Sequence, residues 1–304
     1  MISFRYHVVS IVAVFLALAL GVLLGTTVVN QGVIDDLSRR TNDAAKRSEQ
    51  LRSQVSELQS EVQTWARFGS AVEPLLISGQ LASRQIVVVT QDGVDPAEVA
   101  GVRKALQDAG ATVMSVLVIT NRMTLPDDGA RNDLSTALGV TGSGDPVALS
   151  EMAARELGTR LLTGPTAPNT DLLQRLVDGG FVVLRGGSGT IGEIGQPDQA
   201  VSVLAGGTRE PTLSPAAFLA PLIESLVDGT RPVVAAETAS SVYPFISLIR
   251  RDGALDQRLV TVDNADTMPG RIALVLGLRD LFDDPSKGGD FGVKGGASTL
   301  IPQP

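Results

Sequence analysis

Cysteine is absent from this 304-residue sequence, and histidine occurs only once, as His7. Without cysteine the chain cannot form disulfides, thiolate nucleophiles or thiolate metal sites. Because the one histidine lies near the N-terminus, a mechanism that pairs a nucleophile with a histidine base is excluded from the rest of the chain. The formal net charge of −8 indicates no general basic surface, so we expect no nucleic-acid partner.

Charge is also absent from residues 8–29, a stretch of 22 residues with fourteen Val, Ile, Leu or Phe. A helix of this length measures about 33 Å and can cross the ~30 Å hydrocarbon core of a bilayer. We therefore predict an N-terminal membrane anchor over residues 1–30. The alternative is a cleaved signal peptide with a cleavage site at Ala17-Leu18-Ala19, but the apolar run continues ten residues beyond Ala19.

Small residues recur every four positions within the anchor. They are Ala13, Ala17, Gly21 and Gly25, which this spacing places on one face of a helix. Small residues on one face let two helix backbones approach closely in lipid. We expect this face to be a transmembrane packing surface.

Residues 31–68 carry a repeat of about three and a half residues. From Ile34 onward one row of positions steps by three and four, with no Pro or Gly, and this period predicts a coiled-coil stalk. The row reads Ile34, Leu37, Thr41, Ala44, Ser48, Leu51, Val55, Leu58, Val62 and Trp65. Val at the a positions with Leu at the d positions favours parallel two-stranded coils.

The stalk therefore predicts an interface with a second helix, in a parallel homodimer or a hetero-complex. The residues expected to form it are Ile34, Leu37, Ala44, Leu51, Val55, Leu58, Val62 and Trp65. An amphipathic helix that packs back on its own domain is the alternative. The middle of the row, Thr41, Ala44 and Ser48, is weakly apolar, so it is either a thin stretch or a docking site for a partner helix.

Residues 69–282 alternate strand-like and helical patterns. The strand patterns cover residues 85–90, 111–120, 181–184, 200–204, 232–236 and 259–262. The helical patterns cover residues 96–109, 147–163, 171–178, 215–228 and 268–282. Apolar runs without alternation indicate strands buried on both faces, so we predict an α/β, doubly wound, three-layer domain with a mostly parallel sheet. Residues 283–304, rich in Gly and Pro, are expected to wrap the domain or to extend from it as a tail.

Three segments that follow strands come into question for a ligand site, because ligands of such folds bind beyond the carboxyl ends of strands. In the first, a turn and a helix cap are sufficient to explain Asp92 and Asp95. The other two segments are weak candidates. The glycine-rich turn with Gly186, Gly187 and Ser188 could cradle an anion on backbone amides, or it is only a flexible turn. Asp263, Asn264 and Asp266 could hold a hard cation, or they serve turns and helix caps. The residues indicate no catalytic group, so we expect the protein not to be an enzyme.

Several segments resemble the mycobacterial copper-transport protein B (MctB) family of actinobacterial envelope proteins. They are MISFRYH at residues 1–7, VAVFLALALG at 12–21, VDNAD at 262–266 with Gly270 after it, and the glycine-rich end near Pro302. The resemblance implies a single-pass cell-envelope protein with a cytoplasmic N-terminus and the α/β domain outside. The basic residues that flank the anchor do not decide this orientation.

The resemblance implies a role in copper efflux and resistance, as a proposed pore-forming component. The residues themselves indicate no copper site and no cofactor, because Cu(I) prefers Cys or Met ligands and the methionines are scattered. Relatives are also linked to cell separation during cell division. The alternative function is therefore a non-enzymatic envelope scaffold whose coiled coil recruits a membrane partner in cell separation and peptidoglycan remodelling.

Overall fold

The computed structural model shows a mixed α/β protein, and it describes residues 4–141, 144–167, 170–251 and 258–303. Side chains of residues 26–35, which include the predicted interface residue Ile34, lie outside the described part. The chain divides into two compact units, Met1–Arg67 and Phe68–Pro304. Each unit is described by itself.

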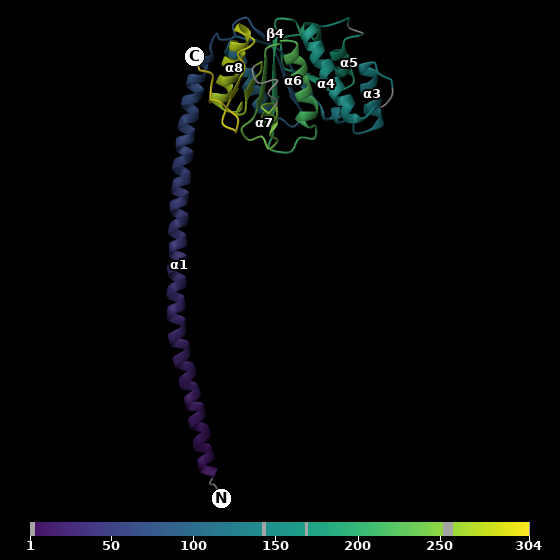
Figure 1. Cartoon of the computed structure of the whole chain (residues 1–304). Coiled ribbons are helices and arrows are strands. Elements are labelled where there is room, and N and C mark those ends of the chain that lie inside the picture. Colours follow the sequence, from purple (N-terminus) through teal and green to yellow (C-terminus); the bar gives the residue numbers. More distant parts are fainter. Residues whose placement is uncertain (1–3, 142–143, 168–169, 252–257, 304) are drawn as a thin grey trace. The chain divides into compact units, whose positions relative to one another are not determined.

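Helix α1 spans Phe4–Ile77, a continuous run of 74 residues (Figure 1). The sequence predicted a change of pattern after Phe68 and Gly69, but the helix continues through Gly69 and Pro74 to Ile77. A turn with Gly79 at a φ of +74° follows and ends the helix. The helical character of both the anchor and the stalk is thus confirmed, while the end of the helix lies later than expected.

The second unit contains a seven-stranded sheet in the order β3-β2-β1-β4-β5-β6-β7. The strands are β1 (Gln85–Gln91), β2 (Thr112–Ile119), β3 (Val182–Arg185), β4 (Gln199–Ala205), β5 (Val233–Glu237), β6 (Val260–Val262) and β7 (Gly289–Phe291). All neighbouring pairs run parallel except β2 and β3, which are antiparallel. The predicted mostly parallel sheet is confirmed.

Helices lie against both faces of this sheet. Alternate residues of β1 belong to two different cores, with Ile86 and Val88 in one and Val87 and Val89 in the other. The first core includes residues of α2 (Pro96–Asp108) and α8 (Met268–Asp283). The second includes residues of α3 (Asp128–Leu138), α4 (Pro146–Thr163), α5 (Leu172–Asp178), α6 (Pro215–Asp228) and α7 (Phe245–Ile249). Burial on both sides explains why the strands read as unbroken apolar runs.

Five elements were not predicted, namely α3, α7, β7 and the 3₁₀ helices η1 (Asn121–Thr124) and η2 (Ile191–Glu193). The short α7 and β7 contain five and three residues, too few for a clear period. Helix α3 has capping residues that the sequence could have revealed, namely Asp127 before it and Gly139 after it. In the structure Asp127 accepts a hydrogen bond from the amide of Ala130, and Gly139 ends the helix at a φ of +73°. Residues 283–304, assigned to a tail from sequence, contribute β7, which pairs in parallel with β6.

A buried ion pair joins α4 to the segment that precedes α5. The Arg160 Nε donates to Asp171 Oδ2 at 2.6 Å, and both side chains are almost fully buried. Arg160 also donates to the carbonyl oxygens of Ile194 and Ile191. Burial raises the pKa of Asp171, but the hydrogen bonds from Arg160 and from the amides of Gln174 and Thr166 outweigh it and leave this pKa below the ordinary value.

This lowered pKa predicts how stability depends on pH. The contribution of Asp171 is fully present above the ordinary aspartate pKa of about 3.9 and is lost as the pH falls through the lower pKa of the folded state. In urea titrations of the full chain in detergent, the difference in unfolding free energy between wild type and Asp171→Asn should shrink as the pH is lowered from about 6 to 2. Glu156→Gln, an exposed change on the same α4, is the control. A difference that stays constant with pH would contradict this assignment.

Candidate functional site

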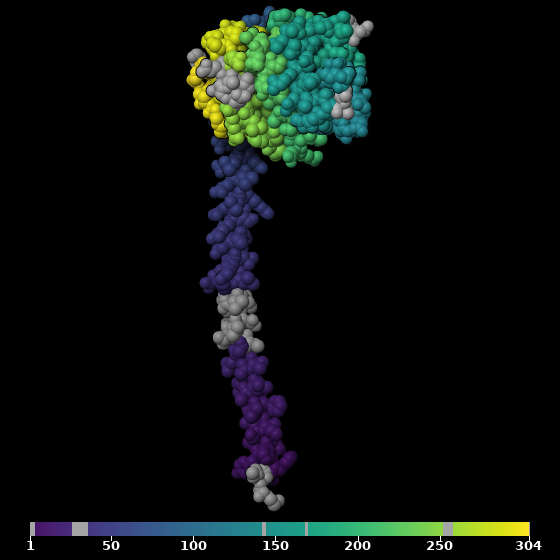
Figure 2. All heavy atoms as spheres, turned by 45° about the vertical axis from the view of Figure 1, so that its right-hand side comes forward, coloured from purple at the N-terminus to yellow at the C-terminus, as the bar shows by residue number. Residues whose placement is uncertain are grey.

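The most prominent feature of the first unit is an uncovered row of large apolar side chains along α1. We call this row, residues 37–65, the stalk seam. The exposed fractions are 64% for Leu37, 61% for Leu51, 51% for Val55, 60% for Leu58, 66% for Val62 and 64% for Trp65. Figure 2 shows the described side chains of this unit standing out around the helix, and nothing else in the unit covers them. From Leu51 to Trp65 the large apolar side chains follow one another along the row, and an exposed apolar surface of this kind is typical of an interaction site.

The stalk seam ends where α1 enters the second unit. The next position of the repeat after Trp65 is Gly69, and a side chain there would approach the Met268 Cε to 3.0 Å. Four residues on, Glu73 accepts two hydrogen bonds of 2.7 Å from the guanidinium of Arg271 on α8. From Gly69 onward the helix therefore packs within its own domain, and the exposed part of the row is confined to residues 37–65.

The small-residue face of the anchor is equally open. Ala13 and Ala17 are exposed, and a Cβ added at Gly21 or Gly25 would meet no atom within 4 Å. The helix that carries them, Phe4–Gly25, is long and apolar enough to cross a membrane by length and composition. The geometry leaves room for a second helix to approach these positions closely.

The second unit has a cavity of about 870 Å³ at the carboxyl ends of its strands. It lies where the strand order reverses, between β1 and β4, the place where ligands bind in open sheets of this type. The lining comes from the ends of β1, β4 and β5, the start of α2, and the end of β3. Among the lining residues are Gln91, Asp92, Arg103, Arg185, Gly206 and Thr238.

Two of the carboxylates that line this cavity accept hydrogen bonds from backbone amides. Asp92 accepts from the amide of Asn121 at 3.0 Å, and Asp95 accepts from the amide of Ala97 at 2.8 Å. Burial, followed by the charges of Asp266 and Asp95, raises the pKa of Glu98. Among the described residues, the buried Gln91 Oε1 and Thr238 Oγ1 have no protein partner. The cavity can hold a polar molecule, but it offers no histidine or cysteine for nucleophilic chemistry.

Of the glycine-rich turn, the structure brings only Gly186 to this cavity. The amides of Ser188 and Gly189 donate to the carbonyl oxygens of Val113 and Met114 at 3.2 and 2.9 Å. A side chain at Gly187 would come within 2.2 Å of the Met114 carbonyl oxygen. The turn thus continues the edge of the sheet alongside β2, and the amides that an anion cradle would need at Ser188 and Gly189 are already in use.

Asp263 lies fully buried within a set of hydrogen bonds. Its carboxylate accepts from Arg250 Nη1 at 2.7 Å and from the amides of Val293 and Lys294 at 2.7 and 3.1 Å. Arg250 also donates to the carbonyl oxygen of Phe291. Asp263 therefore attaches β7 and the residues after it to the end of β6.

A second ion pair, between a partly exposed lysine and a buried glutamate, strengthens this attachment. The Lys294 Nζ donates to Glu237 Oε1 at 2.7 Å, and Glu237 is fully buried at the end of β5. The same Nζ donates to the carbonyl oxygen of Thr238 at 3.0 Å. Two strands of the sheet are thus bonded to the C-terminal residues through the buried carboxylates of Asp263 and Glu237.

The neighbours of Asp263 have separate structural tasks. Asp266 Oδ1 accepts from the amide of Ala239 at 2.6 Å. The carbonyl oxygen of Asn264 lies 1.9 Å from where a Cβ at Gly270 would stand, so only glycine fits there. In the described residues no group of three or more His, Asp or Glu converges as a metal site. The three candidates Asp263, Asn264 and Asp266 therefore do not form a shared cation cage with other carboxylates.

The methionines are spread over different parts of the domain. Met114 and Met123 are buried in the core that covers one face of the sheet, while Met268 packs against the other core. Met152 is 41% exposed on α4. This distribution does not fit a thioether site for Cu(I), which needs several soft ligands together.

Sequence reasoning missed the cavity and the role of Arg250. Both depend on residues brought together from separate strands, which no local spacing reveals. The only sequence signal for the cavity was the expectation that ligands bind beyond the strand ends. Of the residues considered for that reason, Gly186 lines the cavity, and so do Asp92 and Asp95, which the sequence assigned to a turn and a helix cap.

An apolar N-terminal helix followed by an α/β domain fits the class of single-pass membrane proteins with a soluble domain. The chain belongs to the family described as "Copper transport outer membrane protein, MctB", whose model matches residues 1–302. It is 25% identical over 315 residues to a protein of Mycobacterium tuberculosis (strain ATCC 25618 / H37Rv) named "Copper transporter MctB", covering 99% of each chain. A protein of the same name from Mycobacterium leprae (strain TN) is 27% identical over 319 residues, covering 100% of each chain.

The buried pair between Arg250 and Asp263 predicts a large loss of stability on truncation. Arg250 also donates to Asp290 Oδ1 at 3.2 Å, so Asp263→Ala removes one of its two carboxylate partners. The change also leaves the amides of Val293 and Lys294 without their acceptor, and each buried donor left unpaired costs about 1–3 kcal/mol. Pulse proteolysis of the full chain in urea should show this loss together with earlier cleavage of the C-terminal residues. Glu210→Ala, an exposed change in a loop, should alter the unfolding free energy by less than about 0.5 kcal/mol. Equal stability of the two variants would refute the role given to Asp263.

Proposed function

We propose that this chain is a non-enzymatic, membrane-anchored scaffold of the cell envelope that supports copper efflux by assembling with a second helix through its stalk. The observation that carries the proposal is the stalk seam, with large apolar side chains that are more than half exposed over residues 37–65. Membership of the copper-transport family over residues 1–302 supports the link to copper. The N-terminus lies in the cytoplasm and the α/β domain lies outside.

Assembly through the stalk takes the form of a coiled coil. The membrane anchors two chains in the same direction, so their stalks run parallel, as Val at a and Leu at d favour. The partner is a second copy or another membrane protein, and recruitment of such a partner during cell separation and peptidoglycan remodelling is part of the same proposal. The α/β domain is a doubly wound three-layer domain, supported by the reversal of strand order and the helices on both faces.

Copper is the cargo of this proposed process rather than a resident ligand. The donor set of the described domain is unsuited to soft copper, as the dispersed methionines show. A second candidate is a pore-forming component built from several anchors. The open face of Ala13, Ala17, Gly21 and Gly25 favours this candidate, because it lets helices pack closely in lipid.

Polar substitution of the stalk seam tests the assembly. The chain lacks cysteine, so Val55→Cys introduces the only thiol, at an a position where two parallel stalks come together. In native membranes we expect oxidation to yield a crosslinked species, and we expect Leu51→Asn with Leu58→Asn to abolish it. Ser53→Asn with Ser60→Asn, on the outer face of the helix, is the matched control. Crosslinking that survives loss of the seam leucines would contradict the proposal.

Copper titration of the purified full chain tests how copper is handled. We expect no stoichiometric site of sub-micromolar affinity for Cu(I), because no cysteine is present and the methionines do not cluster. Isothermal titration under reducing conditions provides the measurement, with Met152→Leu as the control for the one exposed methionine of α4. One tight saturable site would favour a transport component that binds copper directly.

A further inference from the structure

The stalk seam has two halves of different chemistry. The half near the domain carries Leu51, Val55, Leu58 and Val62, all large and apolar. The half nearer the anchor has Thr41, Ala44 and Ser48 at the same positions of the repeat. The Thr41 hydroxyl already donates to the carbonyl oxygen of Leu37 at 2.8 Å, so it needs no partner across an interface. This half offers shallow positions that larger side chains from another helix can fill.

Basic side chains border this shallow half. The flanking e and g positions of residues 38–54 are Ser38, Arg40, Ala45, Arg47, Arg52 and Gln54, with no carboxylate among them. In a parallel pair of identical stalks, a g position faces the e position of the next heptad of the other helix. Arg47 of one copy would then face Arg52 of the other, and like charges there weaken the pairing. A second copy of the chain is therefore poorly matched to this half.

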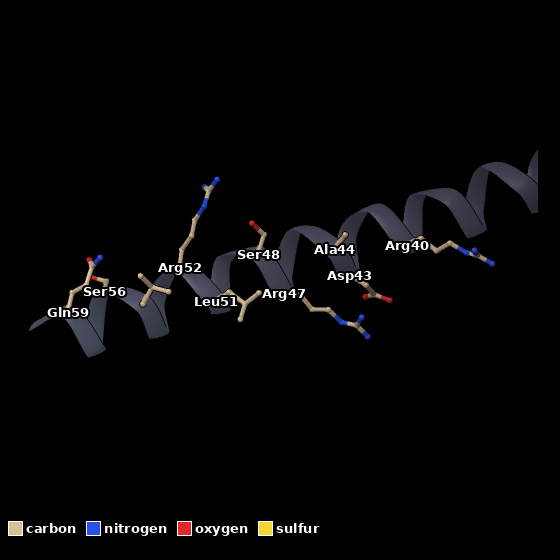
Figure 3. A pocket seen from close by; sticks show the side chains of 10 residues that line it. Arg40, Asp43, Ala44, Arg47, Ser48, Leu51, Arg52, Ser56 and Gln59 are labelled. Carbon is tan, nitrogen blue, oxygen red and sulfur yellow. The ribbon is translucent and has the colours of Figure 1, made fainter. Parts of the chain in front are cut away.

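The two arginines are free to meet another partner. Arg40 pairs with Asp36 at 2.9 Å on its own helix, whereas neither Arg47 nor Arg52 has an ion pair within the described part of the chain. Figure 3 shows Arg47 and Arg52 extending from α1 in opposite directions, with Ser48 and Leu51 between them. The face is thus a shallow row with an arginine on each side. Arg40, Arg47 and Arg52 outnumber the one carboxylate at this face, Asp43, so the border keeps a net positive charge.

The position along the helix argues against lipid headgroups as the occupant. At 1.5 Å per residue, Arg47 and Arg52 lie about 27 and 35 Å of helix beyond residue 29, where the apolar run ends. The field of an anionic membrane surface falls off over a Debye length of about 8 Å. A helix with acidic flanks is the occupant that matches both the charge and the shape.

We propose that residues 41–52 of the stalk bind an amphipathic helix of another membrane protein whose bulky apolar row is bordered by Asp or Glu. This inference rests on the proposed assembly function and names the chemistry of the partner. The partner's large side chains lie over Ala44 and Ser48, and its carboxylates meet Arg47 and Arg52. Residues 53–65 have no basic side chain at their e and g positions, which are Gln54, Gln59 and Glu61, so an acidic flank gains no ion pair there.

Two designed peptides probe this preference on the full chain in detergent. Both are four-heptad helices with Leu at a and d, one with Glu and the other with Lys at every e and g position. We expect the Glu peptide to bind at least tenfold more tightly at about 50 mM salt and the difference to shrink at about 1 M. Fluorescence anisotropy of labelled peptides gives both affinities.

Charge reversal locates the effect. Arg47→Glu with Arg52→Glu should invert the preference, so that the Lys peptide binds more tightly. Arg39→Glu with Lys46→Glu makes the same change of charge at the outer f positions and should leave the preference as it is. Equal affinity for the two peptides, or inversion by the outer variant as well, overturns the inference. The inference is also overturned if anionic phosphatidylglycerol vesicles displace the Glu peptide from the chain.

Failure of this inference can be distinguished from failure of the proposed assembly function. If the Val55→Cys crosslink depends on Leu51 and Leu58 while the peptides show no charge preference, only the present inference fails. If neither peptide binds and the crosslink is indifferent to the seam leucines, the assembly function fails with it.

Discussion

The proposed assembly depends on one feature of α1, a row of large apolar side chains that stays exposed within its own unit. Full burial of each Leu or Val in such a row stabilises by about 1.5–3 kcal/mol, so contact with a second helix is strongly favoured. The anchor restricts any second chain in the same membrane to a parallel direction. The stalk seam stops at Trp65, since the next position, Gly69, already packs against Met268.

The α/β domain, in contrast, buries its apolar side chains within itself. Its sheet is apolar on both faces, and its C-terminal residues are attached through Asp263 and Glu237, two fully buried carboxylates that each meet a cation. These contacts explain the VDNAD segment and Gly270 as parts of the fold rather than as a metal site. What the domain leaves open is the cavity between β1 and β4.

Much of this fold could be predicted from local patterns. The strands β1, β2 and β4 and the helices α2, α4, α6 and α8 were found because burial on both sides produces long apolar runs and caps such as Asp95 mark helix starts. The continuation of α1 past Gly69 and Pro74 could not be predicted, since both residues normally end helices and tertiary packing overrides them here. The hydrogen bonds of Arg250 and the lining of the cavity bring together residues far apart in sequence, so spacing alone could not reveal them. The stalk seam needed only its period, yet no pattern within one chain identifies its partner.

Amide hydrogen exchange along residues 37–65 of the full chain in membranes tests the central claim most directly. An assembled stalk predicts slow exchange centred on residues 51–65, which becomes fast when Leu51 and Leu58 are replaced by Asn. Exchange that is equally fast in the wild type and in this variant would show that the row faces water alone, and it would contradict the account.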